Sequence, residues 1–151
     1  MRIYKITNKN EAKILRVKVK DFDFKKFTPK EIRALIKRMR EAMEKADGIG
    51  LAANQIGLDM KVFVAQVEGK FYAIFNPEIT KTSKEAEIGV EGCLSVPGIT
   101  EEVARSYRVT LKGLDKSGKK ITIKAWGLLA RVFQHETDHL NGKLFIDYLK
   151  K

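Results

Sequence analysis

The sequence contains few cysteines and prolines. Among its 151 residues there is one cysteine, Cys93, so no disulfide bond can form within the chain, and a fold built on a disulfide framework is excluded. Proline occurs three times, and neither a low-complexity tract nor a repeat of fixed period marks a linker. We therefore expect a single domain over residues 1–151, a length that is sufficient to bury a hydrophobic core.

Long hydrophobic runs are also missing. No apolar stretch approaches the roughly 20 residues that a membrane span needs, and the opening MRIYKITNKN has no apolar segment like that of a secretory signal. We therefore expect a cytoplasmic protein without a membrane partner. The formal net charge is +11, but the basic residues form no block of like charge and are not interleaved with aromatic residues. This pattern favours a solvated basic surface, and we expect no stable nucleic-acid partner.

Two segments have the pattern of amphipathic helices. In the first, Thr28 is placed to be the N-cap, Pro29 the first helical residue, and Glu31 the partner of Thr28 in a capping box. Apolar residues then recur at helical spacing until an Asp-Gly pair, which predicts a helix near residues 29–46. The second segment carries both histidines of the chain and ends at the Asn-Gly pair that begins with Asn141.

The region between these helices has the pattern of strands. The segments KVFVAQV, FYAIFNP, YRVTLKGL and KKITIKAW are rich in β-branched and aromatic residues, and turn signals separate them. Residues 107–125 are predicted to form a hairpin. Strands in series, flanked by two helices and without regular alternation of strand and helix, predict an α+β fold with a mostly antiparallel sheet packed around the histidine-bearing helix.

The only two histidines stand four residues apart in QHETDH, at His135 and His139. Side chains at positions i and i+4 share one face of a helix, so these two imidazoles can bind a single metal ion. Glu136 points elsewhere and is free to transfer protons beside the metal. Two histidines packed in the core are the alternative, which is less favoured because each imidazole and Glu136 would need hydrogen-bond partners of its own.

A catalytic divalent ion normally takes three protein ligands and keeps one position for water. Downstream of His139 the chain offers only the carboxylate of Asp147. Upstream, Cys93 stands in EGCLSVPG, between glycine-containing turns where irregular backbone can present a ligand. Cys93, His135 and His139 are all the soft ligands that the chain has, and we expect them to bind one ion; zinc, iron(II), nickel and cobalt all suit this set.

Three blocks of the sequence together resemble the peptide deformylases, the metallohydrolases that remove the formyl group from the initiator methionine of nascent proteins. The blocks are GIGLAANQIG from Gly48, EGCLSVPG from Glu91 and QHETDHLNG from Gln134, and the resemblance covers roughly residues 28–149. It implies hydrolysis of nascent N-formylmethionyl peptides with release of formate, iron(II) as the physiological ion, and transient proximity to the ribosome.

The resemblance also implies roles for single residues beyond the three metal ligands. Glu136 would accept a proton from the attacking water and deliver one to the departing amine. The side chain of Gln55 and the backbone N–H of Leu94 would hold the formyl oxygen while negative charge develops on it. Gly50 would offer its backbone to the substrate, because it lacks a Cβ and permits close approach.

An apolar pocket is expected to select the methionine side chain. By their proximity to the motifs, the residues expected to line it are Ile49, Val90, Leu128 and Val132. Carboxylates near metal-bound histidines usually orient a ligand or pair with a cation, which gives a predicted supporting group of Glu91, Asp138 and Arg105.

The sequence also departs from the family. Arg131 stands where many members have an apolar residue beside the pocket, which bears on peptide preference. The sequence stops at Lys151, before the C-terminal helix through which some members approach the ribosome, so any proximity to the ribosome is expected without that contact.

Other functions were weighed against this prediction. GIGLAA also fits the dinucleotide-binding fingerprint, but that motif must follow a strand and open a helix, whereas here it follows a predicted helix. A metallopeptidase of the common type needs a downstream His or Glu as its third ligand, which the sequence lacks. A basic RNA-binding module with a structural metal would need four protein ligands, and three good ones are present. Deformylation is the function that the sequence favours.

Overall fold

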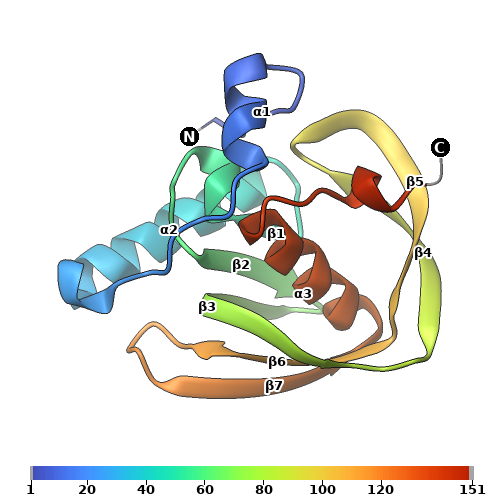
Figure 1. Cartoon of the computed structure of the whole chain (residues 1–151). Coiled ribbons are helices and arrows are strands. Elements are labelled where there is room, and N and C mark those ends of the chain that lie inside the picture. The colour runs from blue at the N-terminus through green and yellow to red at the C-terminus, as the bar shows by residue number, and fades with distance from the viewer. Residues whose placement is uncertain (1, 150–151) are drawn as a thin grey trace.

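The computed structural model describes residues 2–149 (Figure 1). Its α-helices are α1 (Lys9–Leu15), α2 (Pro29–Lys45) and α3 (Gly127–Leu140), and its short 3-10 helices are η1 (Phe24–Lys26), η2 (Ala53–Ile56) and η3 (Phe145–Tyr148). The strands are β1 (Gly50–Ala52), β2 (Val62–Val67), β3 (Lys70–Thr82), β4 (Ala86–Cys93), β5 (Val96–Ser106), β6 (Arg108–Leu114) and β7 (Lys120–Trp126).

The strands form two antiparallel sheets. The larger has the order β1-β2-β3-β6-β7, and the smaller is the hairpin of β4 and β5. This arrangement confirms the predicted α+β class, and the expected hairpin near residues 107–125 is the pair β6–β7. The strand pattern gave no sign of β4 and β5, because β4 buries only the side chain of Glu91 and so has no apolar alternation.

The helix α3 packs against strands of both sheets (Figure 1). One side of α3 buries apolar residues against the larger sheet, in a cluster that includes Phe63, Leu111, Ala130, Phe133 and Leu140. The other side carries the two histidines and faces the hairpin, with which α3 makes contact through β5. The burial of α3 on two sides fixes where its polar residues lie.

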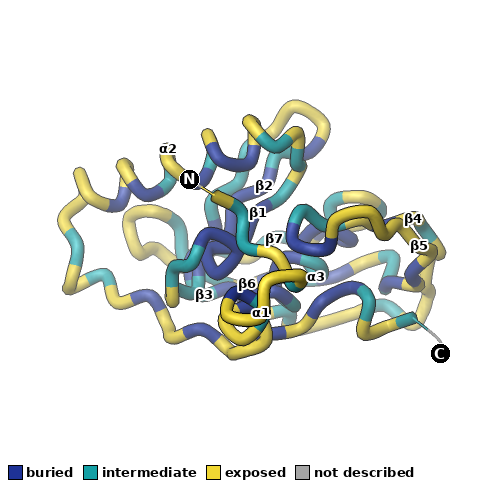
Figure 2. Tube along the Cα trace, turned by 90° about the horizontal axis from the view of Figure 1, so that it is seen from above, coloured by how far each residue is buried: buried dark blue, intermediate teal, exposed yellow. Residues whose placement is uncertain are grey.

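The helix α2 begins where the sequence predicts. The hydroxyl of Thr28 accepts a hydrogen bond from the N–H of Glu31 (3.1 Å), and the carboxylate of Glu31 accepts one from the N–H of Thr28 (2.9 Å). Buried residues recur along α2, as Figure 2 shows, and pack with β1 and β2 in a second cluster. That packing positions the segment after α2, which carries Gly50 and Gln55. Among residues 2–149, no helix is both long enough and apolar enough to cross a membrane.

The capping box gives a test of this reading of α2. Thr28→Ala removes the acceptor for the N–H of Glu31, so the free energy of unfolding is expected to fall by about 1 kcal/mol. Urea denaturation of the wild type and the variant measures this difference. Thr28→Ser retains the hydroxyl and is the matched control, expected to stay within about 0.5 kcal/mol of the wild type. Equal losses in both variants would show that the cap is not the cause.

Candidate metal centre

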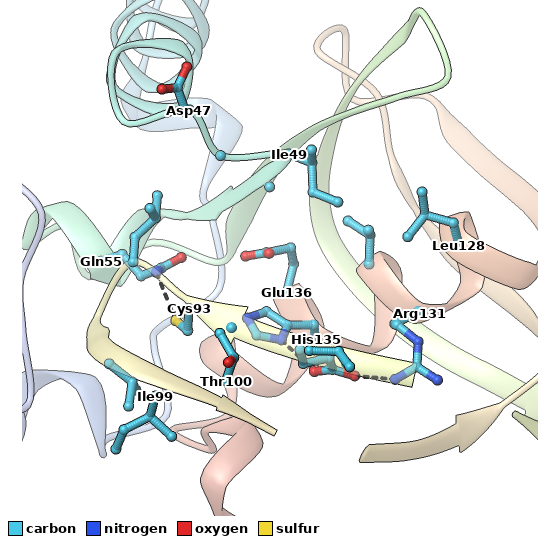
Figure 3. A pocket seen from close by; sticks show the side chains of 18 of the residues that line it. Asp47, Ile49, Gln55, Cys93, Ile99, Thr100, Leu128, Arg131, His135 and Glu136 are labelled. Carbon is cyan, nitrogen blue, oxygen red and sulfur yellow. Dashed lines mark hydrogen bonds and ion pairs between the residues drawn. The ribbon is translucent and has the colours of Figure 1, made fainter. Parts of the chain in front are cut away.

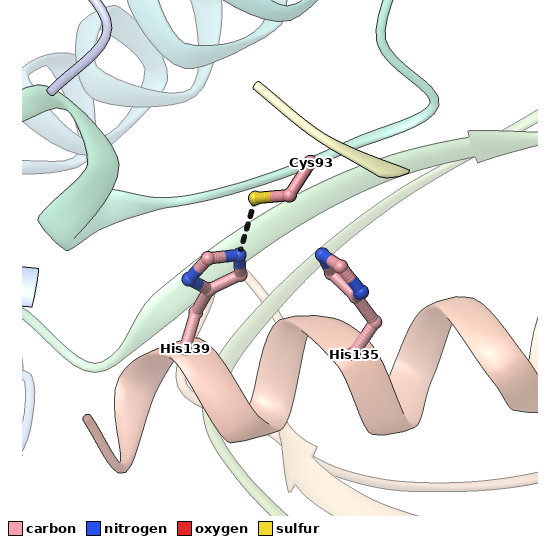
Figure 4. Close-up of side chains that lie close together, drawn as sticks. All are labelled: Cys93, His135 and His139. Carbon is pink, nitrogen blue, oxygen red and sulfur yellow. Dashed lines mark hydrogen bonds between the residues drawn. The ribbon is translucent and has the colours of Figure 1, made fainter. Parts of the chain in front are cut away.

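Cys93, His135 and His139 meet between β4 and α3 (Figure 4). Their ligand atoms all lie within 4.8 Å of one another, and the Sγ of Cys93 is 3.2 Å from the Nε2 of His139. The imidazoles stand on one face of α3 with ring centroids 4.9 Å apart, as their spacing predicts. One sulfur and two nitrogens so close together could hold a metal ion, and three protein ligands are the number that catalytic zinc sites usually have.

The local backbone explains how Cys93 reaches this place. Cys93 was expected in irregular backbone, but it is the last residue of β4 and pairs with Val96; the irregularity is a shift of register between Gly92 and Cys93. The N–H of Ser95 lies 3.4 Å from the sulfur, and the Nε2 of Gln55 lies 3.6 Å from it. Both groups donate to the sulfur, so the loop of Gln55 and the backbone after Cys93 hold it in place beside α3.

The carboxylate downstream of the histidines serves another purpose. Asp147 accepts hydrogen bonds from Arg16 at 2.7 and 2.8 Å and one from the N–H of Leu144 at 3.0 Å. It therefore connects the C-terminal turn to the segment after α1, rather than completing a ligand set with His139. Asp147 is therefore not placed to join the two histidines, and Cys93 is the third candidate ligand beside them.

The charges around the three residues fit a cation. Burial, and then the charge of His135, hold the pKa of His139 well below its ordinary value, so its imidazole is neutral as a ligand must be. Burial lowers the pKa of His135, but hydrogen bonds to Cys93 and Glu91 outweigh it and raise that pKa to about 10. The site thus favours positive charge, which a divalent ion bound to the same atoms would supply.

Glu136 lies beside this group, and its environment suits proton transfer. It is 4% exposed, and burial raises its pKa to about 7. A carboxyl group with a pKa near neutral can both accept and return a proton. Its Oε1 atom is buried without a hydrogen-bond partner among the described residues, so a ligand water has an acceptor there. A Cβ on Gly50 would collide with the carboxylate of Glu136, which is why position 50 needs glycine.

Gln55 is held by the loop that it belongs to. Its Oε1 accepts a hydrogen bond from the N–H of Ala52 (2.9 Å), and its Nε2 donates to the hydroxyl of Ser95 (3.1 Å). The side chain is 2% exposed, so its amide group is fixed toward Cys93, as Figure 3 shows. GIGLAA forms β1 and leads into η2, after a helix rather than a strand, which agrees with rejecting a dinucleotide site.

A pocket of about 400 Å³ opens beside these residues (Figure 3). The four apolar residues predicted from the motifs all line it, together with Gly50, Gln55, Leu94, Arg131 and Glu136. Val132 is buried, whereas Ile49, Val90 and Leu128 are 49%, 68% and 46% exposed. The pocket is therefore apolar on its walls and open to solvent at its rim.

Glu91 is the centre of a buried ionic network. Arg105 donates to both of its carboxylate oxygens at 2.8 and 2.9 Å, and Arg131 donates to Oε2 at 2.6 Å. The Nδ1 of His135 lies 2.9 Å from Oε1, which leaves Nε2 to face the metal position. Burial acts to raise the pKa of Glu91, but the hydrogen bonds and charges of Arg105 and His135 outweigh it and lower that pKa, so Glu91 is ionised.

The network extends to the C-terminal turn. Asp138 accepts from Arg105 at 2.7 Å and from the hydroxyl of Tyr148 at 2.8 Å. Burial and this hydrogen bond raise the pKa of Tyr148 to about 12, so the hydroxyl remains a donor. The structure therefore brings together Glu91, Arg105 and Asp138. The sequence does not predict Tyr148 or the bond from Arg131, because Tyr148 lies outside the three blocks and the motifs place Arg131 only beside the pocket.

Glu136 predicts a dependence of stability on pH in protein stripped of metal. Its pKa is higher in the folded protein, about 7, than the ordinary 4.5, so ionisation opposes folding as the pH rises through this window. Glu136→Gln should therefore have a higher free energy of unfolding than the wild type at about pH 8, and the gap should close by about pH 4. Urea denaturation at both pH values measures it. If the difference in free energy of unfolding between the two proteins instead grows toward low pH, the raised pKa of Glu136 is wrong.

The network around Glu91 predicts a large loss of stability. Glu91→Gln leaves Arg105 and Arg131 buried against a neutral group, and we expect the free energy of unfolding to fall by about 3–5 kcal/mol. The matched control is Glu85→Gln, which removes an exposed pair with Arg108 (3.3 Å) and should cost less than about 1 kcal/mol. Chemical denaturation compares the two. Similar small losses in both variants would contradict the assigned importance of Glu91.

A mostly antiparallel α+β fold, with a Cys-His-His group and a glutamate next to the first histidine, defines a metal-dependent hydrolase as the class of protein. Comparison with known proteins narrows the class. The family described as polypeptide deformylase matches residues 3–151, and the chain belongs to that family. It is therefore an enzyme that removes the N-formyl group from newly synthesised polypeptides.

Individual relatives agree. The peptide deformylase of Carboxydothermus hydrogenoformans is 49% identical over 123 residues, which are 82% of this chain and 80% of the relative. The solved peptide deformylase of Thermotoga maritima is 38% identical, with a TM-score of 0.89 over 99% of this chain and 97% of its own. That of Synechococcus elongatus, solved in complex with actinonin, is 36% identical, with a TM-score of 0.90 over 100% of this chain and 79% of its own.

Proposed function

We propose that Cys93, His135 and His139 bind one divalent ion, iron(II) in the cell, and that the centre deformylates N-formylmethionyl peptides. The observation that carries the proposal is the convergence of the three ligand atoms within 4.8 Å, beside a buried glutamate and an apolar pocket of about 400 Å³. Zinc, nickel or cobalt would fit the same donors. Iron(II) is proposed because members of the family commonly use it.

The residues divide the reaction between them. A divalent ion held there would activate a water and polarise the formyl oxygen. Glu136 takes the proton of the attacking water and returns a proton to the amine that departs as the C–N bond breaks, so that formate and a free N-terminus result. The Nε2 of Gln55 and the N–H of Leu94 donate to the formyl oxygen, where negative charge develops.

The pocket would bind the methionine side chain of the substrate. Ile49, Val90, Leu128 and Val132 offer an apolar surface that a flexible methionine side chain can fill. β1 lies at the edge of the larger sheet, and β4 pairs with β5 alone among the described strands. Both edges border the pocket, so an extended peptide could form backbone hydrogen bonds there.

We also infer that residues 1–151 act as a single domain in the cytoplasm, on nascent N-formylmethionyl peptides. A formal charge of +11 would draw the protein transiently toward ribosomal RNA. We propose no stable nucleic-acid partner and no membrane partner, because the basic residues are spread along the chain rather than grouped.

The function is tested with protein purified without oxygen and loaded with iron(II). It should release formate from a formyl-methionine peptide and leave an unformylated peptide intact. Glu136→Gln should keep the metal and lose about 10²–10⁴-fold in kcat. Cys93→Ala should lose both metal and activity, as metal analysis and a formate assay will show. Formate release at the wild-type rate by metal-free Cys93→Ala would overturn the proposed centre.

A further inference from the structure

The β4–β5 hairpin has little apolar packing on the side of the pocket. In β4 only the side chain of Glu91 is buried, and Ile88 and Val90 are each 68% exposed. A small apolar cluster holds the other part of the hairpin, through Val96 and Val103 packed on the C-terminal turn. The position of β4 beside α3 must therefore depend on polar contacts, since burial of apolar surface contributes little there.

Arg131 of α3 provides such contacts at three points. Its Nη1 donates to the carbonyl of Val103 at 2.9 Å and to the carboxylate of Glu91 at 2.6 Å. Its Nη2 donates to the carbonyl of Glu87 at 2.6 Å. These acceptors lie on both strands of the hairpin, so one guanidinium holds β4 and β5 against the helix that carries the histidines.

The hairpin is shaped to receive this guanidinium. A Cβ on Gly89 would lie 3.0–3.1 Å from three guanidinium atoms of Arg131, so the group rests directly against the backbone of β4. The side chain of Arg131 is 10% exposed. Its charge is matched, because Arg105 and Arg131 stand with two carboxylates, those of Glu91 and Asp138.

Arg105 and Arg131 both donate to the carboxylate of Glu91, but they stabilise different parts of the site. Without Arg131, Glu91 would still receive both bonds from Arg105, and His135 would keep its partner. The side-chain bonds to the carbonyls of Glu87 and Val103, in contrast, come from Arg131. Loss of Arg131 should therefore loosen the hairpin more than it disturbs the histidine.

We propose that Arg131 is a positioning residue that sets the distance between β4 and α3, and thereby the width of the pocket for the substrate side chain. Val90 of β4 lines this pocket, and so do Leu128 and Val132 of α3, so the spacing of these two elements affects its width. The inference rests on the proposed use of this pocket for methionine. The planar guanidinium suits the task because it presents several donors in fixed directions, whereas lysine offers one point charge.

The first test separates binding from chemistry. In the metal-loaded enzyme, Arg131→Met should raise KM for a formyl-methionine peptide about tenfold and change kcat less than about threefold. Arg131→Lys should fall between this variant and the wild type. Arg108→Met, which removes an exposed arginine that pairs with Glu85, is the control and should leave both constants unchanged.

Gly89→Ala tests the same contact from the other side. Its Cβ should displace the guanidinium, so KM should rise in the same direction as in Arg131→Met. Because both changes remove one contact, the double variant should be no worse than Arg131→Met alone. Independent, additive effects on KM would show that the two residues do not act together. If Arg131→Met does not fold, Arg131→Lys and Gly89→Ala decide the question.

Hydrogen exchange provides a readout that does not need activity. Backbone amides of β4 should exchange faster in Arg131→Met and Gly89→Ala than in the wild type, while those of α3 stay protected. Unchanged exchange in β4, or an unchanged KM in an active enzyme, would overturn the role of Arg131. If the wild type releases no formate, the proposed function is wrong. The exchange rates of the β4 amides would still show whether Arg131 holds the hairpin against α3.

Discussion

The carboxylate of Glu91 is the interaction on which the site depends. It is a buried anion at the pocket-facing end of β4, and it accepts from two arginines and contacts the imidazole of His135. A buried charge of this kind is stable only when its partners are in place, so the hairpin, α3 and the C-terminal turn must be assembled together. The same carboxylate also orients the imidazole of His135, one of the candidate metal ligands.

Different interactions hold different parts of the molecule together: apolar clusters in one part, and hydrogen bonds and ion pairs in the other. Apolar clusters fix α2 and α3 against the larger sheet, and through them Gly50, Gln55 and the two histidines. Polar bonds from Arg131 fix the pocket side of the hairpin that carries Cys93 and Val90, and a small apolar cluster that includes Val96 and Val103 fixes its other part. Apolar packing tolerates little displacement, whereas hydrogen bonds at a solvent-exposed strand can open locally. The apolar packing therefore positions Gln55, Glu136 and the two histidines, whereas the hairpin carries Cys93 and borders the pocket.

The sequence predicted best those features that depend on residues close together in the chain. The capping box of α2 depends on residues three apart, and the face shared by His135 and His139 depends on helical periodicity alone. Cys93 could be proposed because the chain has so few soft ligands. The hairpin of β4 and β5 could not be predicted, since its strands are held by charged side chains and carry little apolar pattern.

The contacts of Arg131 show a further limit. Its acceptors at Glu87 and Val103 are backbone carbonyls, which every residue possesses, so no residue type in the sequence marks them.

The exposed edge of β4 also bears on contacts between copies of the chain. Among the described strands β4 pairs with β5 alone, and a strand edge of this kind is a template on which a second copy of the chain could add a strand. Lys84, Glu85 and Glu87, just before Ile88, are exposed, and charged side chains at such an edge oppose the addition of a second strand.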